Sequence, residues 1–258
     1  MPPCAKFGLM GPSSAVLHVI RCGTAALLLA ISSHACESSG EPVTVGNVLV
    51  FCHRGSDGNQ TLNVLPMDDG SPLRISGRAS IPSHYAIHSM VAYGDQLIVL
   101  LWDQVEIYSL ADPSAPSRVA AHQLKKQRPD EGGFPHIEPA GDDGKFMVLS
   151  PIGAAELRAD PDGRTWSLMD VELTADLHDK AVNPSAELVS AIRALVSERD
   201  SGRPRLVKET SRFRYELFWK TRMKPGEIFH TQYLRKVDKS RRKAVGQFVL
   251  CEELETID

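Results

Sequence analysis

The sequence predicts a mainly β protein: a small or incomplete β-propeller of about four blades, with one inserted amphipathic helix and a C-terminal antiparallel meander. Three observations lead to this prediction. A degenerate repeat of about 48 residues fills the first part of the chain after its N-terminal segment. Short apolar runs alternate with turn residues inside the repeat, which then gives way to helical and finally to strand periodicity.

The repeat is clearest in two pairs of segments. At an offset of about 48, the pairs are 88–100 with 136–149, and 111–113 with 159–161. Residues 62–70 align with 105–113 at an offset of 43 and add an earlier copy. The three units therefore lie near 45–83, 84–131 and 132–173. One such unit cannot bury its own apolar face, so the repeat predicts sheets that pack on each other.

The second unit has the plainest strand pattern. Residues 97–102 are a continuous apolar run, typical of a strand covered on both faces. Residues 105–110 form the next expected strand, the prolines of 111–116 end it, and 118–124 offer a third. Proline fixes φ and cannot donate to a sheet ladder, which suits it to these turns.

The repeat is followed by a helical pattern. Residues 186–198 place apolar side chains at helical spacing, namely Leu188, Ile192, Leu195 and Val196. Asn183 or Ser185 can cap the start of this helix, and Gly202 and Pro204 end it. We expect an amphipathic helix packed on the sheets.

Three further strands are expected at 212–222, 227–237 and 244–254, as an antiparallel meander. Two interpretations remain open, because the meander can be the last blade or a separate small sheet. The predicted organisation is a signal peptide at 1–35, a linker at 36–44, propeller-like repeats at 45–173, a helical insertion at 174–202 and a basic β-meander at 203–258.

The N-terminal segment has the layout of a secretory signal peptide. Residues 22–31 are an apolar run too short to span a bilayer, and Arg21 precedes it. Ser33 and Ala35 place small residues before a cut at Cys36. The true start is Met1 or Met10.

Cys36 is followed by Glu-Ser-Ser-Gly, and this junction resembles that of a bacterial lipoprotein. The resemblance covers about fifteen residues. It implies that Cys36 becomes the lipid-carrying N-terminus of the mature chain. The protein is then expected to be exported and held at the bacterial cell envelope, either membrane-anchored or periplasmic or extracellular.

Residues 105–119 are similar to the LVIVD repeat of bacterial surface β-propellers, in which a strand, an Asp-Pro turn and a second strand close each unit. His88, placed before a Gly-Asp turn, fits the same pattern. The resemblance covers about half of the mature chain and is weaker in the other two units. At about 48 residues a unit, the mature chain allows four or five blades, fewer than the usual six or seven.

Cys52 and Cys251 are a candidate disulfide pair. Both end similar strand patterns near the two ends of the mature chain, and an oxidising compartment permits the bond. Such a bond would fasten the first strands to the last. The alternative is a pair of buried thiols.

Charge divides the chain into an acidic body and a basic tail. Residues 41–200 hold 13 Lys and Arg against 23 Asp and Glu, giving −10, whereas 203–243 hold 14 against 4, giving +10. A candidate anion-binding surface lies in the expected hairpin turn, at Lys239, Arg241, Arg242 and Lys243. The alternatives are that the basic tail docks on the acidic body, or is only solvated.

The histidines His88, His136 and His178 recur at similar intervals. If all three faced a central channel, they could hold a divalent metal, the one cofactor that the sequence suggests. The alternative is that each is a packed or hydrogen-bonded residue of the repeat. The sequence has no nucleophile elbow, phosphate-binding loop or dinucleotide fingerprint.

We therefore expect an exported, lipid-anchored envelope protein that acts as a binding or scaffold module, with an unspecified ligand. Its expected partner is an envelope protein, a polysaccharide or an anionic membrane surface, and nucleic acid is not expected. The rival hypothesis is a metal-dependent envelope enzyme that uses the three histidines. A third is a degenerate fragment of a larger propeller.

Overall fold

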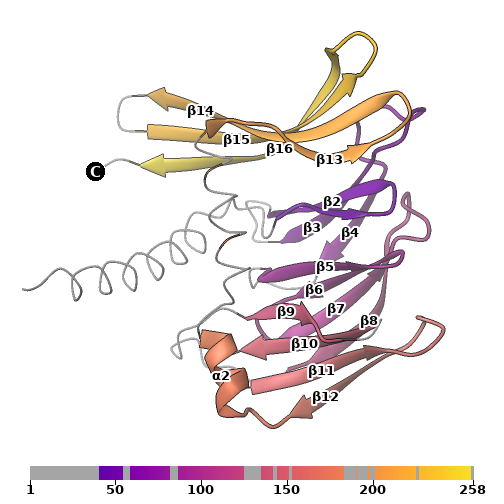
Figure 1. Ribbon diagram of the computed structural model, residues 1–258, viewed down its shortest axis with the longest axis vertical. Helices are drawn as coiled ribbons and strands as arrows, with labels where there is room; N and C mark the ends of the chain where they lie inside the picture. The colour runs from indigo at the N-terminus through magenta and orange to yellow at the C-terminus, as the bar shows by residue number, and fades with distance from the viewer. Residues whose placement is uncertain are drawn as a thin grey trace, which may run out of the picture. The chain divides into compact units, whose positions relative to one another are not determined.

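The computed structural model describes residues 41–54, 59–81, 87–124, 135–141, 144–150, 153–182, 190, 197, 201–224 and 227–256. All of them belong to the compact unit formed by residues 36–258. They form four antiparallel sheets of four strands each, and within each sheet the strands follow in chain order (Figure 1). No helix in this part of the chain has the length and apolar character needed to cross a membrane.

The bounds of the strands are as follows. The first sheet contains β1 (Val43–Val45), β2 (Val48–Arg54), β3 (Gln60–Pro66) and β4 (Gly77–Ile81). The second contains β5 (Ser89–Tyr93), β6 (Gln96–Leu100), β7 (Gln104–Ser109) and β8 (Ser117–Gln123). The third contains β9 (His136–Pro139), β10 (Lys145–Ser150), β11 (Gly153–Ala159) and β12 (Trp166–Val171). The fourth contains β13 (Arg205–Glu209), β14 (Phe213–Lys224), β15 (Glu227–Asp238) and β16 (Lys243–Thr256).

Neighbouring sheets pack face to face through three apolar clusters. The first and second sheets share a cluster that includes Val50 and Val99. The second and third share one that includes Ile98 and Val148. Alternate residues of β6 thus face opposite neighbours, which explains why this strand is apolar at every position after Gln96.

The third cluster joins the first sheet to the fourth through side chains that include Leu49 and Leu234. The packing order is therefore fourth, first, second and third sheet, as Figure 1 also shows. The last sheet of the chain lies against the first, as it does where a propeller ring closes. This arrangement confirms the mainly β fold and the small, incomplete propeller of about four blades.

One backbone hydrogen bond recurs in all four sheets. The N–H of the last residue of the third strand, or of the residue directly after it, donates to the carbonyl of the residue that precedes the second strand. The four bonds are Met67 to Asn47 (2.7 Å), Leu110 to Asp95 (2.8 Å), Ala159 to Gly144 (2.8 Å) and Lys239 to Arg212 (3.0 Å). Met67 and Leu110 are 43 residues apart, which is the offset seen in the sequence. The fourth sheet thus closes its two central strands with the same hydrogen bond as the other three sheets.

In the described part of the chain, the ring is open between the third and fourth sheets. The helix α2 (Ala175–Val182) packs Leu177 and Ala181 against Leu149 on the far face of the third sheet. No apolar cluster of the described residues joins that sheet to the fourth. The stack therefore ends on α2 at one flank and on the outer face of the fourth sheet at the other.

The helix α2 lies inside the helical insertion expected at 174–202, before the helix expected at 186–198. Thr174 precedes α2 and accepts a hydrogen bond from the N–H of Leu177 at 3.3 Å. Of the predicted helix at 186–198, only Ser190 and Ser197 belong to the described residues, and both are helical. The rest of that prediction lies outside the described residues.

The three strands predicted in the meander correspond to β14, β15 and β16. The innermost strand, β13, was not predicted. It has only five residues, and its pairing with β14 shifts register between Leu206 and Lys208. A short strand with a bulge gives little periodic signal, because alternation is lost where the register changes.

An aspartate organises the turn after the third strand in every sheet. Its carboxylate accepts backbone N–H bonds from residues two to five positions ahead. The four are Asp68 (from Gly70 and Ser71), Asp112 (from Ser114), Asp160 (from Arg164 and Thr165) and Asp238 (from Ser240 and Arg241). Hydrogen bonds to the charged form lower the pKa of each of these carboxyls, that of Asp160 to about 2.

These turns make stability depend on pH. Because the folded pKa of Asp160 lies below its ordinary value of 3.8, its contribution is complete above about pH 4 and disappears as the pH falls through about 2. We expect Asp160→Asn to lower the urea midpoint at pH 6. Near pH 2 the urea midpoints of the variant and the parent protein should be much closer to each other. Urea unfolding across this range measures the effect. Asp103→Asn is the control, because no described residue donates a hydrogen bond to the Asp103 carboxylate, and a parallel pH response of both variants would contradict the prediction.

Each of the first three turns also rests on the sheet that precedes it in the packing order. Lys236 of the fourth sheet donates to Asp68 O (3.0 Å) and Ser71 O (2.9 Å) in the turn of the first sheet. Gln96 of the second sheet donates to Gly163 O in the turn of the third, at 2.7 Å. The turn of the second sheet meets the first sheet at Gly77, where an added Cβ would overlap Pro113 O.

Gly77→Ala should therefore loosen the contact between the first two sheets. The added methyl meets the backbone carbonyl of Pro113 and the ring of Pro116, neither of which is the flexible end of a side chain. We expect a loss of about 1–3 kcal/mol in the free energy of unfolding, measured by urea denaturation. Gly70→Ala is the control, because its Cβ would meet only Asp68 Oδ1 at an ordinary 3.7 Å. Equal stability of the two variants would contradict the prediction.

Candidate anion-binding surface on the fourth sheet

The turn between β15 and β16 is tightly built. Asp238 is buried and accepts hydrogen bonds from the N–H groups of Ser240 (3.0 Å) and Arg241 (3.2 Å) and from the Ser240 hydroxyl (2.6 Å). Arg242 adopts a left-handed backbone with φ of 51°. The four basic residues predicted as an anion-binding surface lie in this turn or directly after it, in a fixed backbone conformation.

Lys239, one of these four residues, is committed to the protein itself. Its Nζ lies 2.9 Å from Glu209 Oε1 and donates to Thr210 O at 2.9 Å. The same pairing lowers the pKa of Glu209. Arg212 is also engaged, because its Nε lies 3.5 Å from Asp238 Oδ2 and its guanidinium lies over the Phe213 ring. Both cations fasten the turn to the connection between β13 and β14.

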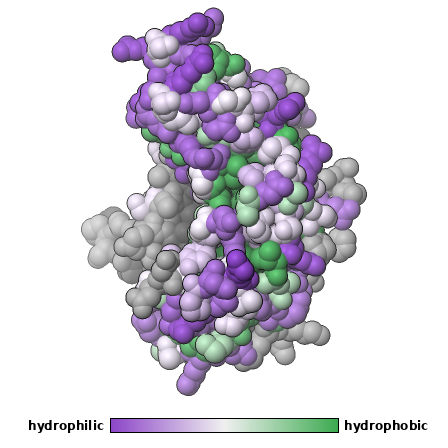
Figure 2. All heavy atoms as spheres, turned by 90° about the vertical axis from the view of Figure 1, so that its right-hand side faces the viewer, coloured by the Kyte–Doolittle hydropathy of each residue, from purple (hydrophilic) through white to green (hydrophobic). Residues whose placement is uncertain are grey.

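The other three residues, Arg241, Arg242 and Lys243, remain available to bind a ligand. We call them the cationic turn. All three are exposed, and no ion pair with a described residue involves them. Guanidinium groups bind carboxylate and phosphate through two parallel N–H bonds, and ammonium groups bind them as point charges. Hydrophilic side chains gather over the fourth sheet at the top of Figure 2.

Other basic residues of the C-terminal segment dock on the first sheet. Lys236 is buried, donates to the first sheet's turn and lies over the rings of Phe213 (4.2 Å) and Tyr215 (5.5 Å). Burial lowers its pKa. Arg205 pairs with Glu41, and Lys208 donates to Gly46 O. Some basic residues of the C-terminal segment therefore bind the acidic body of the protein, whereas those of the cationic turn do not.

The position of the cationic turn explains why it is open. In the first three sheets the equivalent turn rests on the preceding sheet. The fourth sheet has no preceding sheet among the described residues, so its turn reaches the open flank of the stack. The cationic turn therefore occupies a contact position that the protein does not fill with its own described residues.

The outer face of the fourth sheet continues this surface. Phe218 and Tyr233 pair across β14 and β15, with ring centroids 5.1 Å apart and an interplanar angle of 17°. Arg235 lies over Phe218 at 4.9 Å and binds Glu216 at 2.6 Å. Neither Phe218 nor Tyr233 was among the sites predicted from the sequence. The available signal was the strand alternation in residues 213–220, where Phe218 falls on the face that is otherwise charged.

The three histidines proposed as metal ligands do not form one site. His136 opens β9 opposite Leu149, whereas the residue opposite Leu100 in the second sheet is Ser89, so His88 lies one register position earlier. His178 is exposed on α2. Nowhere in the described ranges do three or more His, Cys, Asp or Glu side chains group as metal ligands.

Local contacts explain His88 and His136. His88 packs on Trp102, with ring centroids 5.2 Å apart, and burial lowers its pKa to about 4. A neutral, packed imidazole fits the alternative interpretation of a structural histidine. Nε2 of His136 lies 3.3 Å from Glu138 Oε1 on its own strand.

The candidate disulfide is not formed. Cys52 is buried in the cluster between the first and second sheets, where its Sγ lies 3.7 Å from Met90 Sδ. Cys251 is buried in β16, in the sheet that packs on the opposite face of the first sheet. Strand alternation directs Cys52 away from that sheet, because Phe51 and not Cys52 faces it. Burial raises the pKa of the Cys52 thiol. The proposed lipidation site, Cys36, lies outside the described residues.

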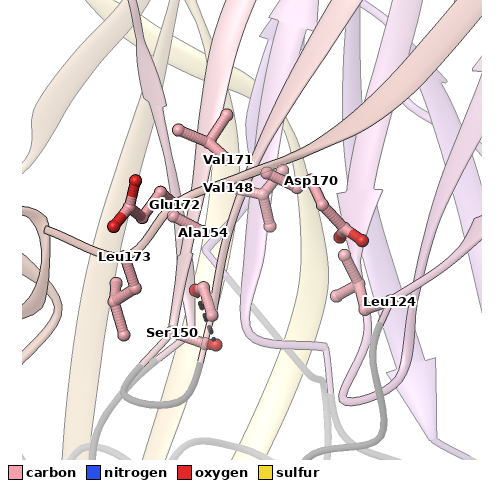
Figure 3. Close-up of a pocket in the computed structure, with 10 residues that line it drawn as sticks. Leu124, Val148, Ser150, Ala154, Asp170, Val171, Glu172 and Leu173 are labelled. Atoms are coloured by element: carbon pink, nitrogen blue, oxygen red, sulfur yellow. Dashed lines mark hydrogen bonds between the residues drawn. The ribbon is translucent and has the colours of Figure 1, made fainter.

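A small pocket of about 200 Å³ lies at the third sheet (Figure 3). Its lining includes Leu124, Val148 and the carboxylates of Asp170 and Glu172. The Ser150 hydroxyl donates to Gly153 O at 3.0 Å and so belongs to its own hairpin. The lining residues of this pocket include no histidine.

No protein-family model matches the chain, and no curated protein matches it. Among solved structures, it is similar to a protein from Lactobacillus plantarum, with 11% identity, 81% of this chain and 71% of that chain covered, and a TM-score of 0.37. A putative 6-phosphogluconolactonase from Bacteroides uniformis has 10% identity, 84% and 73% coverage, and a TM-score of 0.37. The N-terminal domain of Nup159 has 10% identity, 79% and 46% coverage, and a TM-score of 0.34. Likenesses this distant do not extend to activity or ligand.

Proposed function

We propose that this protein is exported, anchored by a lipid on Cys36, and serves as a binding module of the bacterial cell envelope. Its binding surface is the cationic turn, which holds an anionic polymer of the envelope. The observation that carries the proposal is the set of three exposed cations, Arg241, Arg242 and Lys243, on a turn whose equivalents in the other sheets rest on a neighbour.

The charge distribution supports the same partner. The turn belongs to a segment of net charge +10, and the charges that it presents are solvent-exposed. Exposed charges attract polyanions at low salt and are screened over about 8–10 Å at physiological salt. Binding is therefore expected to be reversible and to weaken as salt is added.

Export and anchoring are tested on the mature N-terminus. We expect mass spectrometry of the protein purified from bacterial membranes to find a chain that begins with lipid-modified Cys36. Cys36→Ala should abolish the modification and release the protein from the membrane fraction. A chain that retains residues 1–35, or a Cys36→Ala variant that is equally membrane-bound, would contradict the anchoring.

Binding is tested with polygalacturonate, an acidic polysaccharide, by isothermal titration calorimetry on the mature chain. The triple variant R241A/R242A/K243A should bind about tenfold more weakly, since each exposed ion pair is worth about 0.2–1 kcal/mol. Raising the salt concentration should weaken binding by the parent protein and reduce the difference in affinity between it and the triple variant.

The matched control is R74A/R78A/R164A. It removes three exposed arginines from the first and third sheets and changes the net charge equally. If both triple variants lose affinity equally, binding reflects net charge and the cationic turn is not the site. If anionic phospholipid vesicles bind through the turn as strongly as the polymer does, the ligand is the membrane surface.

A further inference from the structure

We infer that the polymer is a chain of acidic sugars, which lies along the outer face of the fourth sheet from the cationic turn to the aromatic pair Phe218–Tyr233. The inference rests on the proposed function and adds the chemical class of the ligand. The structure provides two different contacts in line, one for charge and one for the apolar face of a sugar ring.

The aromatic pair lies on an open face. Both rings are half-buried, and neither belongs to the apolar clusters that join the sheets. Leu206, opposite Glu216, and Val249, opposite Tyr233, share this face and are 49% and 47% exposed. The Phe218 ring is already stacked on Tyr233 and covered by the Arg235 guanidinium. The part of the pair that this face offers to a ligand is therefore the exposed part of the Tyr233 ring.

Arg235 connects the aromatic pair to the charged end of the surface. Its Nε and Nη2 bind Glu216 at 3.2 and 2.6 Å, and its guanidinium lies over the Phe218 ring at 4.9 Å. A guanidinium has five N–H donors, so the donors on Nη1 remain for a ligand. The contacts with Glu216 and Phe218 fix the plane of the group, which reduces the entropy that binding costs.

The strand sets the direction of the site. Tyr233, Arg235 and Val237 alternate onto the same outer face of β15, and the turn follows Asp238. Five residues of extended strand separate Tyr233 from the turn, roughly 17 Å. A single small anion cannot contact both ends, whereas an extended polymer can.

The chemistry of these contacts selects acidic sugars. The C–H groups of a pyranose ring form an apolar face that packs on aromatic rings, and its carboxylates accept hydrogen bonds from guanidinium groups. An acidic polypeptide can bind the basic residues through its carboxylates, but it has no sugar ring to pack on the aromatic pair. A second copy of this face is a poor partner, because both copies would present the same basic turn.

The experiment compares three polymers on the mature chain: polygalacturonate, which is acidic and made of sugars, polyglutamate, which is acidic only, and dextran, which is a neutral sugar polymer. Tyr233→Ala should lower the affinity for polygalacturonate about fivefold or more and leave the affinity for polyglutamate unchanged. R241A/R242A/K243A should lower the affinity for both acidic polymers. Val119→Ala, an apolar change at a similarly exposed position (46%) on β8 of the second sheet, is the control and should leave the affinity for both acidic polymers unchanged.

The outcomes separate the two proposals. If Tyr233→Ala affects both acidic polymers equally, or neither, the sugar assignment is overturned while the cationic turn stands. If the parent protein binds no acidic polymer, the proposed function fails. Self-association or vesicle binding that depends on Tyr233 also overturns the sugar assignment. Tyr233→Leu, which keeps an apolar side chain without the ring, should reproduce the loss at an unchanged thermal midpoint, so that a folding defect cannot imitate it.

Discussion

The fold depends on one constraint, which is that the central strands of the first and second sheets are apolar on both faces and must be covered on both sides. Val99 and Ile98 are neighbours in β6 and belong to different clusters, as do Val50 and Leu49 in β2. A sheet of this kind is stable only between two others. The recurring turn contacts add directional hydrogen bonds to this packing, and they place each turn on the preceding sheet.

The same constraint identifies the two ends of the stack. An end sheet has a neighbouring sheet on one face only, so its other face must be covered by another element or carry polar side chains. The third sheet covers part of its far face with α2 and places the ion pairs of Lys145, Glu156 and Arg158 on the same face. The fourth sheet uses Arg235 and Glu216 with an aromatic pair. Part of the positive charge of the fourth sheet has a structural role, since Lys236 donates a hydrogen bond to the turn of the first sheet. The basic residues that make no such contact form the proposed binding surface.

Much of the architecture could be predicted from the sequence because it follows from local periodicity. The repeat, the strands of the second unit and the three long strands of the meander all appear near their expected places. The helix α2 falls inside the helical insertion expected at 174–202 but outside the apolar pattern at 186–198, because a segment of four apolar and four polar residues is too short to show helical periodicity. The repeat does not reveal strand register, which separates two of the candidate metal ligands. An offset of 48 matches His88 to His136 in the sequence, but His136 lies opposite Leu149 in the third sheet, whereas Ser89 and not His88 lies opposite Leu100 in the second.

The sequence by itself determined which segments form sheets, where turns interrupt them and how charge divides between the body and the tail, because alternation, proline and aspartate act over a few residues. Only the tertiary structure decided how those charges are used. Lys236 and Lys239 are both lysines of one basic segment, yet one is buried against the first sheet and the other is bound to Glu209. The three cations beside them stay exposed because the stack ends there, and where a stack ends is set by the packing of whole sheets rather than by any local pattern.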